Sequence, residues 1–379
     1  MAEYTGGHIV TYYVDGVNGD DTNNGLTPSL SGRGAGPWKT IQYGFDKIAD
    51  GTIGDGDELR IMATKVYHIG AVLDMDWNGK EVVISGCTSA NTALVDGTIV
   101  EINGNTAAMD GLTMMHGSVG TLDGTVFQNF YINAADNAGT CVHQSVTNSH
   151  NVCWVNCRFS SAKSTGFLID ASSYYNFVNC RFDNNGSRGL EESGSNFNLH
   201  YKCLFDNNED DGAYIQQFSR IVECIFTGNS GDGLAQNNLG NITANCIMHG
   251  NYDHGHRSQG SGQSIHIGNI YSNNGLDGSG SGTIVGSGCE ARFINSVWYG
   301  NDDIWGYTSG TDHMAVYNSI TAGTDPGFLS PAGPTFDFTP SHTFNGIGAG
   351  LPTPYSWFGK TADDAGVNKF KSSESISVF

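Results

Sequence analysis

A five-residue pattern returns along the chain at nearly constant spacing, and it constrains the fold more than any other feature. Its third position advances by 23, 23, 21, 22, 23, 27 and 23 residues. The copies occupy residues 155–159, 178–182, 201–205, 222–226, 244–248, 267–271, 294–298 and 317–321. Repeats of roughly 20 to 50 residues are typical of solenoids, in which each repeat forms one coil.

Each copy alternates in a way that is typical of a β-strand. Positions one, three and five are apolar in nearly every copy and are expected to face the interior. A coil of about 22 residues accommodates three short strands joined by turns, and successive coils would stack about 4.8 Å apart. The sequence therefore predicts an all-β protein built as a parallel β-solenoid.

Two columns of turn residues accompany the repeat. Glycine makes up 53 of the 379 residues, which argues against a helical protein because each interior glycine destabilises a helix by roughly 1 kcal/mol. One column consists of Gly166, Gly189, Gly212, Gly233 and Gly255. The other consists of Asn185, Asn208, Asn229, Asn251, Asn274 and Asn301, whose side chains are expected to bond the coils above and below.

A cysteine column occupies the third position of the pattern. Its members are Cys157, Cys180, Cys203, Cys224 and Cys246. A metal or redox role is one interpretation, and a stack of buried small hydrophobes is the other. Coil spacing exceeds the Cβ separation of about 3.8 Å that disulfides prefer, so we predict free thiols.

The fourth position of the pattern is apolar over six successive copies, although a solvated strand should be polar there. The residues are Leu204, Ile225, Ile247, Ile270, Val297 and Ile320. Such a stripe marks a surface against which something packs. Either the C-terminal segment of the chain covers it or the same stripe of other copies does, and we predict a homotrimer.

The two ends of the chain show a family resemblance. Trp38, Ile41, Phe45 and Ile48 have helical spacing and predict an amphipathic helix over the first coil. The segments 12–16, 19–25 and 37–42, together with 325–328 and 336–340, resemble right-handed parallel β-helix proteins of the pectate-lyase-like superfamily. The resemblance implies an N-terminal cap over residues 1–54, a right-handed β-helix over 55–321 and a closing segment over 322–379. The superfamily includes polysaccharide lyases, hydrolases and epimerases as well as phage tailspike, fibre and capsid-surface proteins, so the fold alone does not settle the function.

One candidate catalytic site follows from the glycine column. Asp211, Asp232 and His254 precede successive glycines, and Arg257 follows shortly after. Carboxylates one coil apart would lie about 5 Å from each other, as in a retaining glycosidase. The arrangement loosely resembles that of polygalacturonases, but the Asn-Thr-Asp and Arg-x-Lys signatures are missing. Asp before Gly is also ordinary turn chemistry, so both interpretations stay open.

Two candidate binding sites complete the set. A row of polar and aromatic residues suits sugar hydroxyls or a merely solvated face: Tyr214, Gln216, Gln236, Asn237 and Gln259. The loop with Asp15, Asp20, Asp21 and Asn23 could bind Ca²⁺ through oxygen ligands, although Ser31 stands where an EF-hand loop needs Glu. Plain Asn/Asp/Gly turns explain this loop as well, and no other cofactor is expected.

Charge and patterning narrow the function further. A net charge of −21 disfavours nucleic acid as a partner. No apolar stretch reaches the length of a membrane span, and residues 1–20 lack the features of a signal peptide. We predict a structural or glycan-binding protein, not an enzyme, at the virion surface or outside the cell, such as a phage fibre, spike or capsid decoration. The alternative is a polysaccharide hydrolase or lyase that uses the acid pair.

Overall fold

The computed structural model describes residues 10–321, with gaps at 78, 89–99, 110, 118–121, 146–149, 171–172, 238, 277, 279, 308–312 and 318–319, as well as residues 328–330 and 337–340. Contacts divide the chain into two compact units. Unit 1 comprises the described residues of Met1–Lys163 and Phe167–Phe177, and unit 2 those of Ser164–Gly166 and Val178–Val378. The three segments predicted from the sequence stay a prediction, and most of residues 322–379 lie outside the described part.

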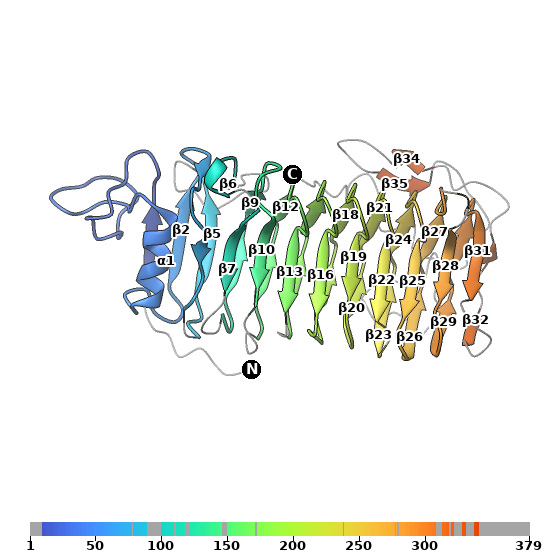
Figure 1. Ribbon diagram of the computed structural model, residues 1–379. Coiled ribbons are helices and arrows are strands. Elements are labelled where there is room, and N and C mark those ends of the chain that lie inside the picture. Colours follow the sequence, from blue (N-terminus) through green and yellow to red (C-terminus); the bar gives the residue numbers. More distant parts are fainter. Residues whose placement is uncertain are drawn as a thin grey trace. The chain divides into compact units, whose positions relative to one another are not determined.

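Unit 1 consists of coils that contribute strands to three parallel sheets (Figure 1). The first sheet contains β1 (Thr11–Val14), β2 (Glu58–Met62), β5 (Val83–Cys87), β8 (Val126–Gln128), β11 (Cys153–Val155) and β14 (Asn176–Val178). The second contains β3 (Tyr67–His68), β6 (Val100–Asn103), β9 (Phe130–Asn133) and β12 (Arg158–Ser160). The third contains β4 (Leu73–Asp74), β7 (Thr113–Gly117), β10 (Thr140–Gln144) and β13 (Phe167–Asp170). A short 3₁₀ helix, η1, spans Ala107–Met109.

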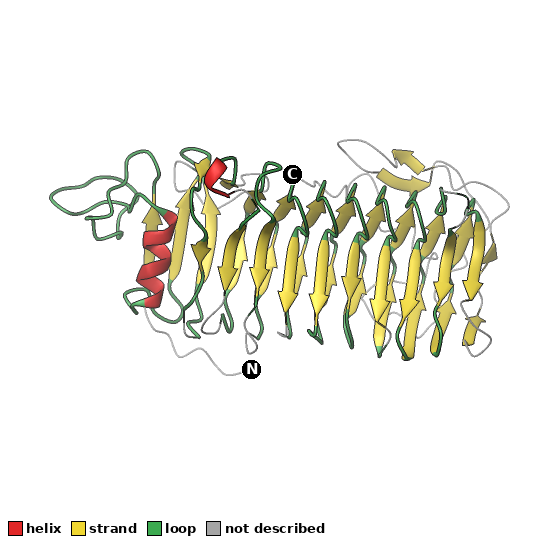
Figure 2. Cartoon of the chain, in the orientation of Figure 1, coloured by secondary structure: helices red, strands yellow, loops and turns green. Residues whose placement is uncertain are grey.

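The predicted amphipathic helix is confirmed as α1 (Ile41–Ala49), drawn in red beside the first strands of unit 1 in Figure 2. Thr40 caps it, because its Oγ1 accepts a hydrogen bond from the backbone N–H of Tyr43 at 3.3 Å. Ile41, Phe45 and Ile48 are buried, as their spacing predicts. Trp38 is also buried but precedes the helix, where its indole N–H donates to the carbonyl of Asn23 at 2.8 Å.

Unit 2 repeats the three-strand coil more regularly. Its first sheet contains β17 (Leu199–Tyr201), β20 (Arg220–Val222), β23 (Asn241–Ala244), β26 (Gly262–Ile267), β29 (Cys289–Ile294) and β32 (His313–Tyr317). The second contains β15 (Arg181–Asp183), β18 (Leu204–Asp206), β21 (Ile225–Thr227), β24 (Ile247–His249), β27 (Ile270–Ser272), β30 (Val297–Tyr299) and β33 (Ile320–Thr321). The third contains β16 (Leu190–Ser193), β19 (Ala213–Ile215), β22 (Leu234–Asn237), β25 (His256–Gln259), β28 (Ser281–Val285) and β31 (Asp303–Tyr307). The strands β34 (Phe328–Ser330) and β35 (Asp337–Pro340) form a separate antiparallel pair.

A corner, not a single strand, lies inside each copy of the repeat. In one coil β17 ends at Tyr201 and β18 begins at Leu204, and between them Lys202 has a left-handed φ of 56°. The expectation that positions one, three and five share one face is therefore wrong. The cysteines of the column lie at this corner, where they are buried and free, as predicted. The fifth position does face inward, since the rings of Phe205 and Phe226 stack at 4.7 Å.

The apolar stripe of the fourth position is not an open surface. Phe205 points into the core, so its neighbour Leu204 points to the outside of the second sheet. The described side chains of the stripe are nevertheless only 0–1% exposed: Leu204, Ile225, Ile247, Ile270 and Val297. A single chain was sufficient to bury them, so the expectation of a free trimer interface at these residues is corrected. The side chain of Ile320 lies outside the described part, and the homotrimer stays a prediction.

The asparagine column forms a hydrogen-bonded ladder in unit 2, as predicted. The side-chain amide of Asn208 donates to Oδ1 of Asn229 at 2.9 Å and to the carbonyl of Phe182 at 3.1 Å. Its own Oδ1 accepts the backbone N–H and the amide of Asn185. The same bonds recur down the column to Asn301.

The glycine column is explained by space. A Cβ on Gly212 would lie 2.5 Å from the carbonyl oxygen of Gly233 and 2.8 Å from Nδ2 of Asn229. Adjacent coils therefore approach too closely at this corner for any side chain.

Candidate functional site

The predicted acid column is present in unit 2, on the corner that leads into the third sheet. The backbone N–H of Asp232 donates to Oδ1 of Asp211 at 3.0 Å, and that of His254 donates to Oδ1 of Asp232 at 3.2 Å. Nδ1 of His254 in turn accepts the backbone N–H of Ser281 at 2.9 Å. Each side chain thus satisfies the backbone of the next coil, which is the turn chemistry that the sequence left open as an alternative.

Two arginines cover the carboxylates. Arg257, on β25, pairs with Asp232 and places Nη2 3.6 Å from Oδ1 of Asp211. Arg188 donates from Nε to Oδ2 of Asp211 at 3.3 Å. Both aspartates are 1% exposed. The structure therefore brings Asp211, Asp232, His254 and Arg257 together, but it encloses the two carboxylates.

Burial dominates the electrostatics of the acid pair. It raises the pKa of Asp211 above its usual value. Burial and the neighbouring Asp211 carboxylate raise the pKa of Asp232 to about 8, against the opposing effect of Arg257. Perturbed carboxyls of this kind occur in catalytic sites and also in structural ion-pair networks.

The outward face of the third sheet in unit 2 carries four of the five residues predicted to bind glycans. Tyr214, Gln216, Asn237 and Gln259 are all partly exposed and lie on or beside β19, β22 and β25. The amide of Asn237 donates to Oε1 of Gln216 at 3.0 Å, which links two adjacent coils. The guanidinium of Arg188 lies 4.7 Å from the centre of the Tyr214 ring.

A hollow continues this face. It has a volume of about 450 Å³ and is lined by Arg257, Ser258, Gln259, Gly260, Ser261, Ile284, Gly286 and Ser287. Amide, hydroxyl and guanidinium groups therefore surround a concave surface beside the polar row. This combination can bind the hydroxyl groups of a sugar.

Gln236 is a correction to the predicted row. It is fully buried and points to the interior, because neighbouring residues of a strand face opposite ways. Its Oε1 lies 3.0 Å from Nε2 of His256, and its amide donates to Thr243 at 3.0 Å. His256 lies beside His266, with ring centres 4.3 Å apart. Burial lowers the pKa of His256 well below its usual value and that of His266 to about 3.

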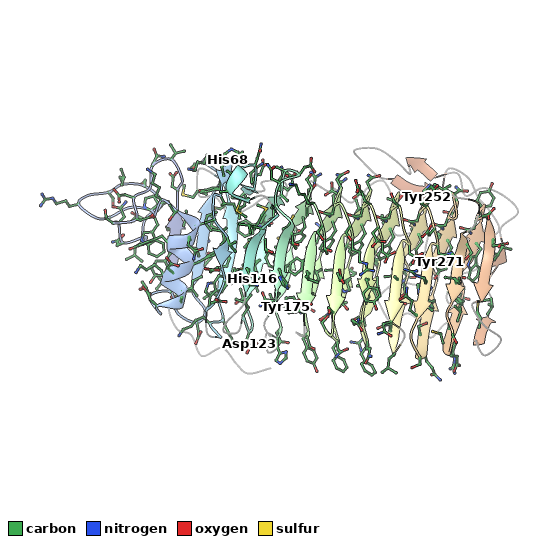
Figure 3. All side chains as sticks on the ribbon, viewed as in Figure 1. His68, His116, Asp123, Tyr175, Tyr252 and Tyr271 are labelled. Carbon is green, nitrogen blue, oxygen red and sulfur yellow. The ribbon has the colours of Figure 1, made fainter. Side chains whose placement is uncertain are left out.

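A histidine cluster in unit 1 escaped the sequence reasoning. His116 on β7 pairs in register with His143 on β10, and their ring centres are 5.1 Å apart. Nε2 of His143 lies 2.7 Å from Oδ2 of Asp170, while Nε2 of His116 lies 3.2 Å from Oγ of Ser145. Burial and the adjacent His143 lower the pKa of His116. Figure 3 labels His116 among the side chains of the third sheet.

The signal for this cluster was weak. The two histidines are 27 residues apart, and the regular five-residue pattern begins only at residue 155. His143 and Asp170 are also 27 residues apart, so one step links the three positions.

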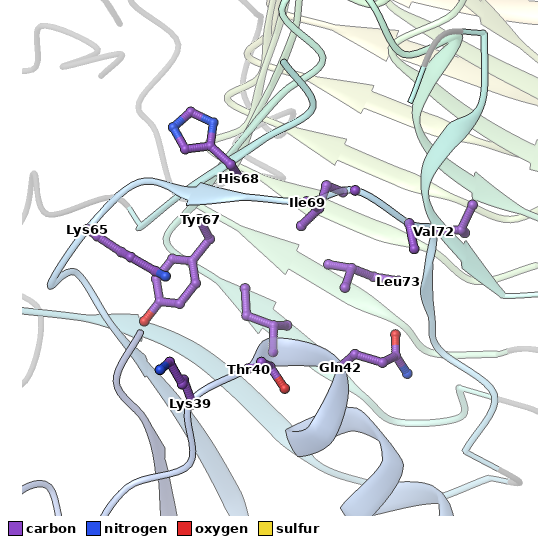
Figure 4. Close-up of a pocket in the computed structure, with 12 residues that line it drawn as sticks. Lys39, Thr40, Gln42, Lys65, Tyr67, His68, Ile69, Val72 and Leu73 are labelled. Carbon is purple, nitrogen blue, oxygen red and sulfur yellow. The ribbon is translucent and has the colours of Figure 1, made fainter. Parts of the chain in front are cut away.

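A pocket of about 220 Å³ lies beside the start of α1 in unit 1 (Figure 4). Lys39, Lys65 and Tyr67 line one part of it, and Val72 and Leu73 line another. Among the described residues neither lysine forms an ion pair. The pocket therefore combines two positive charges with an apolar wall.

The loop predicted as a possible Ca²⁺ site is held by its own hydrogen bonds. Asp15 accepts the backbone N–H groups of Val17 and Asn18, at 2.9 and 3.1 Å. Asp21 accepts the backbone N–H of Lys39 at 2.7 Å, and burial is slight there.

The other two predicted ligands of this loop are engaged in the same way. Asp20 accepts from Thr22 at 2.9 Å, and the amide of Asn23 donates to the carbonyl of Pro37 at 3.0 Å. Within the described part of the chain, no group of three or more His, Cys, Asp or Glu side chains is arranged to hold a metal ion. Ca²⁺ binding here stays a prediction. The helices that the structure describes also include none that is long and apolar enough to cross a membrane.

Comparisons with known proteins support the architecture. A family model described as a right handed beta helix region matches residues 70–241. Pectate lyase Pel9A superimposes with a TM-score of 0.61 at 16% identity, covering 94% of this chain and 96% of the lyase. The A-module of the mannuronan C-5 epimerase AlgE4 from Azotobacter vinelandii gives 0.50 at 14% identity, covering 75% of this chain and 91% of the module.

A viral protein is also similar. ORF18 of Geobacillus virus E2 gives a TM-score of 0.49 at 11% identity, covering 70% of this chain and 52% of the viral one. No curated protein matches the sequence. At these identities the likeness concerns the fold alone, and the chain is a right-handed parallel β-helix, as predicted.

Proposed function

We propose that the protein binds glycans on the outward face of the third sheet in unit 2. One observation carries this proposal: partly exposed amide and aromatic side chains continue over three successive strands into a hollow lined by hydroxyl, amide and guanidinium groups. Gln216 and Asn237 are hydrogen-bonded to each other across coils, so their positions are fixed before a ligand arrives. A preorganised row of this kind loses less conformational entropy on binding than free side chains do.

The acid pair supports binding in preference to cleavage. A glycosidase needs one carboxyl group to protonate the leaving oxygen and another to attack the sugar or to activate water. Asp211 and Asp232 are both enclosed, each accepts a backbone N–H, and each is paired with arginine. In this arrangement neither carboxylate is presented to a sugar.

Binding to a panel of immobilised polysaccharides tests the proposal. We expect the protein to bind at least one glycan, and Gln216→Ala and Gln259→Ala to weaken that binding by about fivefold or more. Gln263→Ala is the matched control, because Gln263 is an exposed glutamine on the first sheet of the same unit. Equal affinities of all variants would place the binding elsewhere, and the absence of any binding would contradict the proposal.

The particle location is proposed together with this activity. A fibre, spike or capsid decoration that recognises a host surface needs a rigid scaffold with a repeated polar face, which the β-helix supplies. Co-purification of the protein with virus or phage particles tests this, and recovery only in the particle-free fraction would contradict it. A mass measured by light scattering tests the homotrimer.

A second candidate function rests on the histidine cluster of unit 1. The lowered pKa of His116 favours its neutral form, and Asp170 orients the ring of His143. A neutral imidazole beside a carboxylate-held imidazole can act as general base and general acid. A polysaccharide-degrading activity of this protein would therefore reside here, and not at Asp211 and Asp232.

Release of sugar fragments from a glycan panel tests this candidate. We expect His116→Gln and His143→Gln to abolish any activity, while Asp211→Asn and Asp232→Asn keep it. The reverse pattern would restore the acid pair as the catalytic site. No activity of the wild-type protein on any glycan would exclude both.

A further inference from the structure

Bulky aromatic residues occupy a left-handed corner of the coil. Phe197 and Phe218, at the corner between the third and first sheets of unit 2, have φ values of 61° and 56°. The next coil has Gly240 at this position, with φ 72°. In unit 1, Tyr174 takes the equivalent place in its own coil, with φ 62°. A bulky residue at positive φ is a conformational outlier, because its Cβ crowds the backbone.

The same chain shows which residues the fold itself selects for such a corner. After the second sheet of unit 2, six successive coils also pass through a left-handed residue. These residues are Asn184, Asn207, Gly228, Gly250, Asn273 and Gly300. Asn and Gly are the types that adopt this conformation most readily. Phe197 and Phe218 therefore occupy positions where folding alone would favour other residues.

Burial does not account for the two phenylalanines either. Phe197 is 45% exposed and Phe218 is 39% exposed. Their rings stack with centres 5.0 Å apart and planes 11° apart. A Cβ at Gly240 would lie 2.5 Å from the Phe218 ring, so this glycine leaves room for the ring. Leu239, next to it, is 38% exposed and extends the apolar surface.

We propose that Phe197 and Phe218 form an apolar ridge against which the C–H face of a bound sugar ring rests. This inference rests on the glycan-binding function proposed above and names a further part of its site. Backbone strain and exposed apolar surface occur together at functional sites, because selection for folding alone would remove both.

The surroundings of the ridge fit a sugar better than an apolar partner. Asn196 and Gln217 pair as adjacent backbone positions of neighbouring coils, immediately before the two rings in the chain, and both are partly exposed. Gln216, at the end of the polar row, is separated from Phe218 by one residue. A pyranose has apolar C–H faces and a polar hydroxyl rim, so it matches an aromatic ridge flanked by amides. An unbranched polysaccharide could contact the row and the ridge together.

Replacing each phenylalanine with the residue type that the other corner uses separates folding from binding. The variants are Phe197→Asn, Phe218→Gly and the double substitution. The control is Lys202→Asn, at a left-handed position with φ 56° on a different corner of unit 2. The probe is the polysaccharide of the panel that binds the wild-type protein most tightly, and the melting temperature of each variant is measured alongside.

We expect the phenylalanine variants to melt at the same temperature as the wild type or higher, and to bind the polysaccharide about tenfold more weakly. Lys202→Asn should leave binding unchanged. If the wild type binds, Gln216→Ala weakens binding and the phenylalanine variants do not, the ridge is overturned while the glycan face stands. If the wild type binds no glycan, both proposals fall. A lower melting temperature with unchanged binding would show that the rings serve the fold. A change in particle mass in solution in place of affinity would identify a contact between copies, which also overturns the ridge.

Discussion

Replacing Asn229 with alanine removes the centre of the asparagine ladder. Nδ2 of Asn229 donates to the carbonyl of Phe205 at 3.1 Å and to Oδ1 of Asn251 at 2.9 Å. Its Oδ1 accepts the backbone N–H and the side-chain amide of Asn208, at 3.1 and 2.9 Å. The residue is 1% exposed. Asn229→Ala therefore breaks four hydrogen bonds in a place that solvent does not reach.

The cost follows from those bonds. A typical intramolecular hydrogen bond contributes about 0.5–1.5 kcal/mol, so four bonds correspond to about 2–6 kcal/mol, and we expect a loss of about 4 kcal/mol. Asn301→Ala should cost less. Asn301 ends the described ladder and makes three such bonds, to Asn274 twice and to the carbonyl of Tyr271.

Urea unfolding followed by circular dichroism measures these losses. Ser230→Ala is the control, because Ser230 is the exposed neighbour of Asn229 and should change stability by less than about 0.5 kcal/mol. Asn229→Asp retains one acceptor but faces the carbonyl of Phe205 with a second oxygen, so its destabilisation should be larger at pH 7 than at pH 3. A loss for Asn229→Ala below about 1 kcal/mol would refute the view that the ladder holds adjacent coils together.

Three further predictions concern the packing and the buried ionisable groups. Gly212→Ala should destabilise the protein by about 1–3 kcal/mol, because its Cβ would collide with the carbonyl of Gly233, whereas Gly70→Ala meets nothing within 4 Å and should be nearly neutral in the same urea titration. The pKa of Asp232 is raised in the folded state, so its stabilising contribution is complete below about pH 4 and is lost as the pH rises through about 8. The wild type should therefore lose stability relative to Asp232→Asn across that range, and parallel pH profiles of the two proteins would contradict this. The pKa of His266 is lowered to about 3, so the unfolded chain binds its proton first and the protein should lose stability as the pH falls below about 6.5; His266→Gln should reduce that loss, and an unchanged acid limb would argue against it.

The coil could be predicted from the sequence because its constraints repeat. The asparagine ladder, the glycine column and the stack of acid residues each depend on one register, which the spacing of 21 to 23 residues reveals. The corner within each copy was hidden, because Lys202 and Glu223 adopt left-handed φ values there although neither is a turn-forming type. The buried outer stripe was hidden for a different reason, since its burial depends on packing that no local pattern encodes.

The site was predictable only where strand alternation was applied consistently. Gln236 and Asn237 are neighbours on β22, so both cannot face the same way, and the structure turns Gln236 inward. A polar interior was not expected at all, yet Glu192 and His200 lie there with Oε1 and Nε2 2.8 Å apart. The phenylalanine corner could not be found from sequence, because an aromatic residue in an amphipathic pattern is usually assigned to the core.

The ladder also shows where the chain can change its length. Four of its steps span 21 to 23 residues, but Asn274 and Asn301 are 27 residues apart and still bond at 2.9 Å. The extra residues follow Asn274, where Gly275 and Gly278 have φ values of 83° and 79° and the chain bulges outward before β28 resumes the coil. Elsewhere in unit 2 a protein engineer could add or delete sequence only as whole coils, whereas this bulge is a natural entry point for a tag, an epitope or an entire inserted domain.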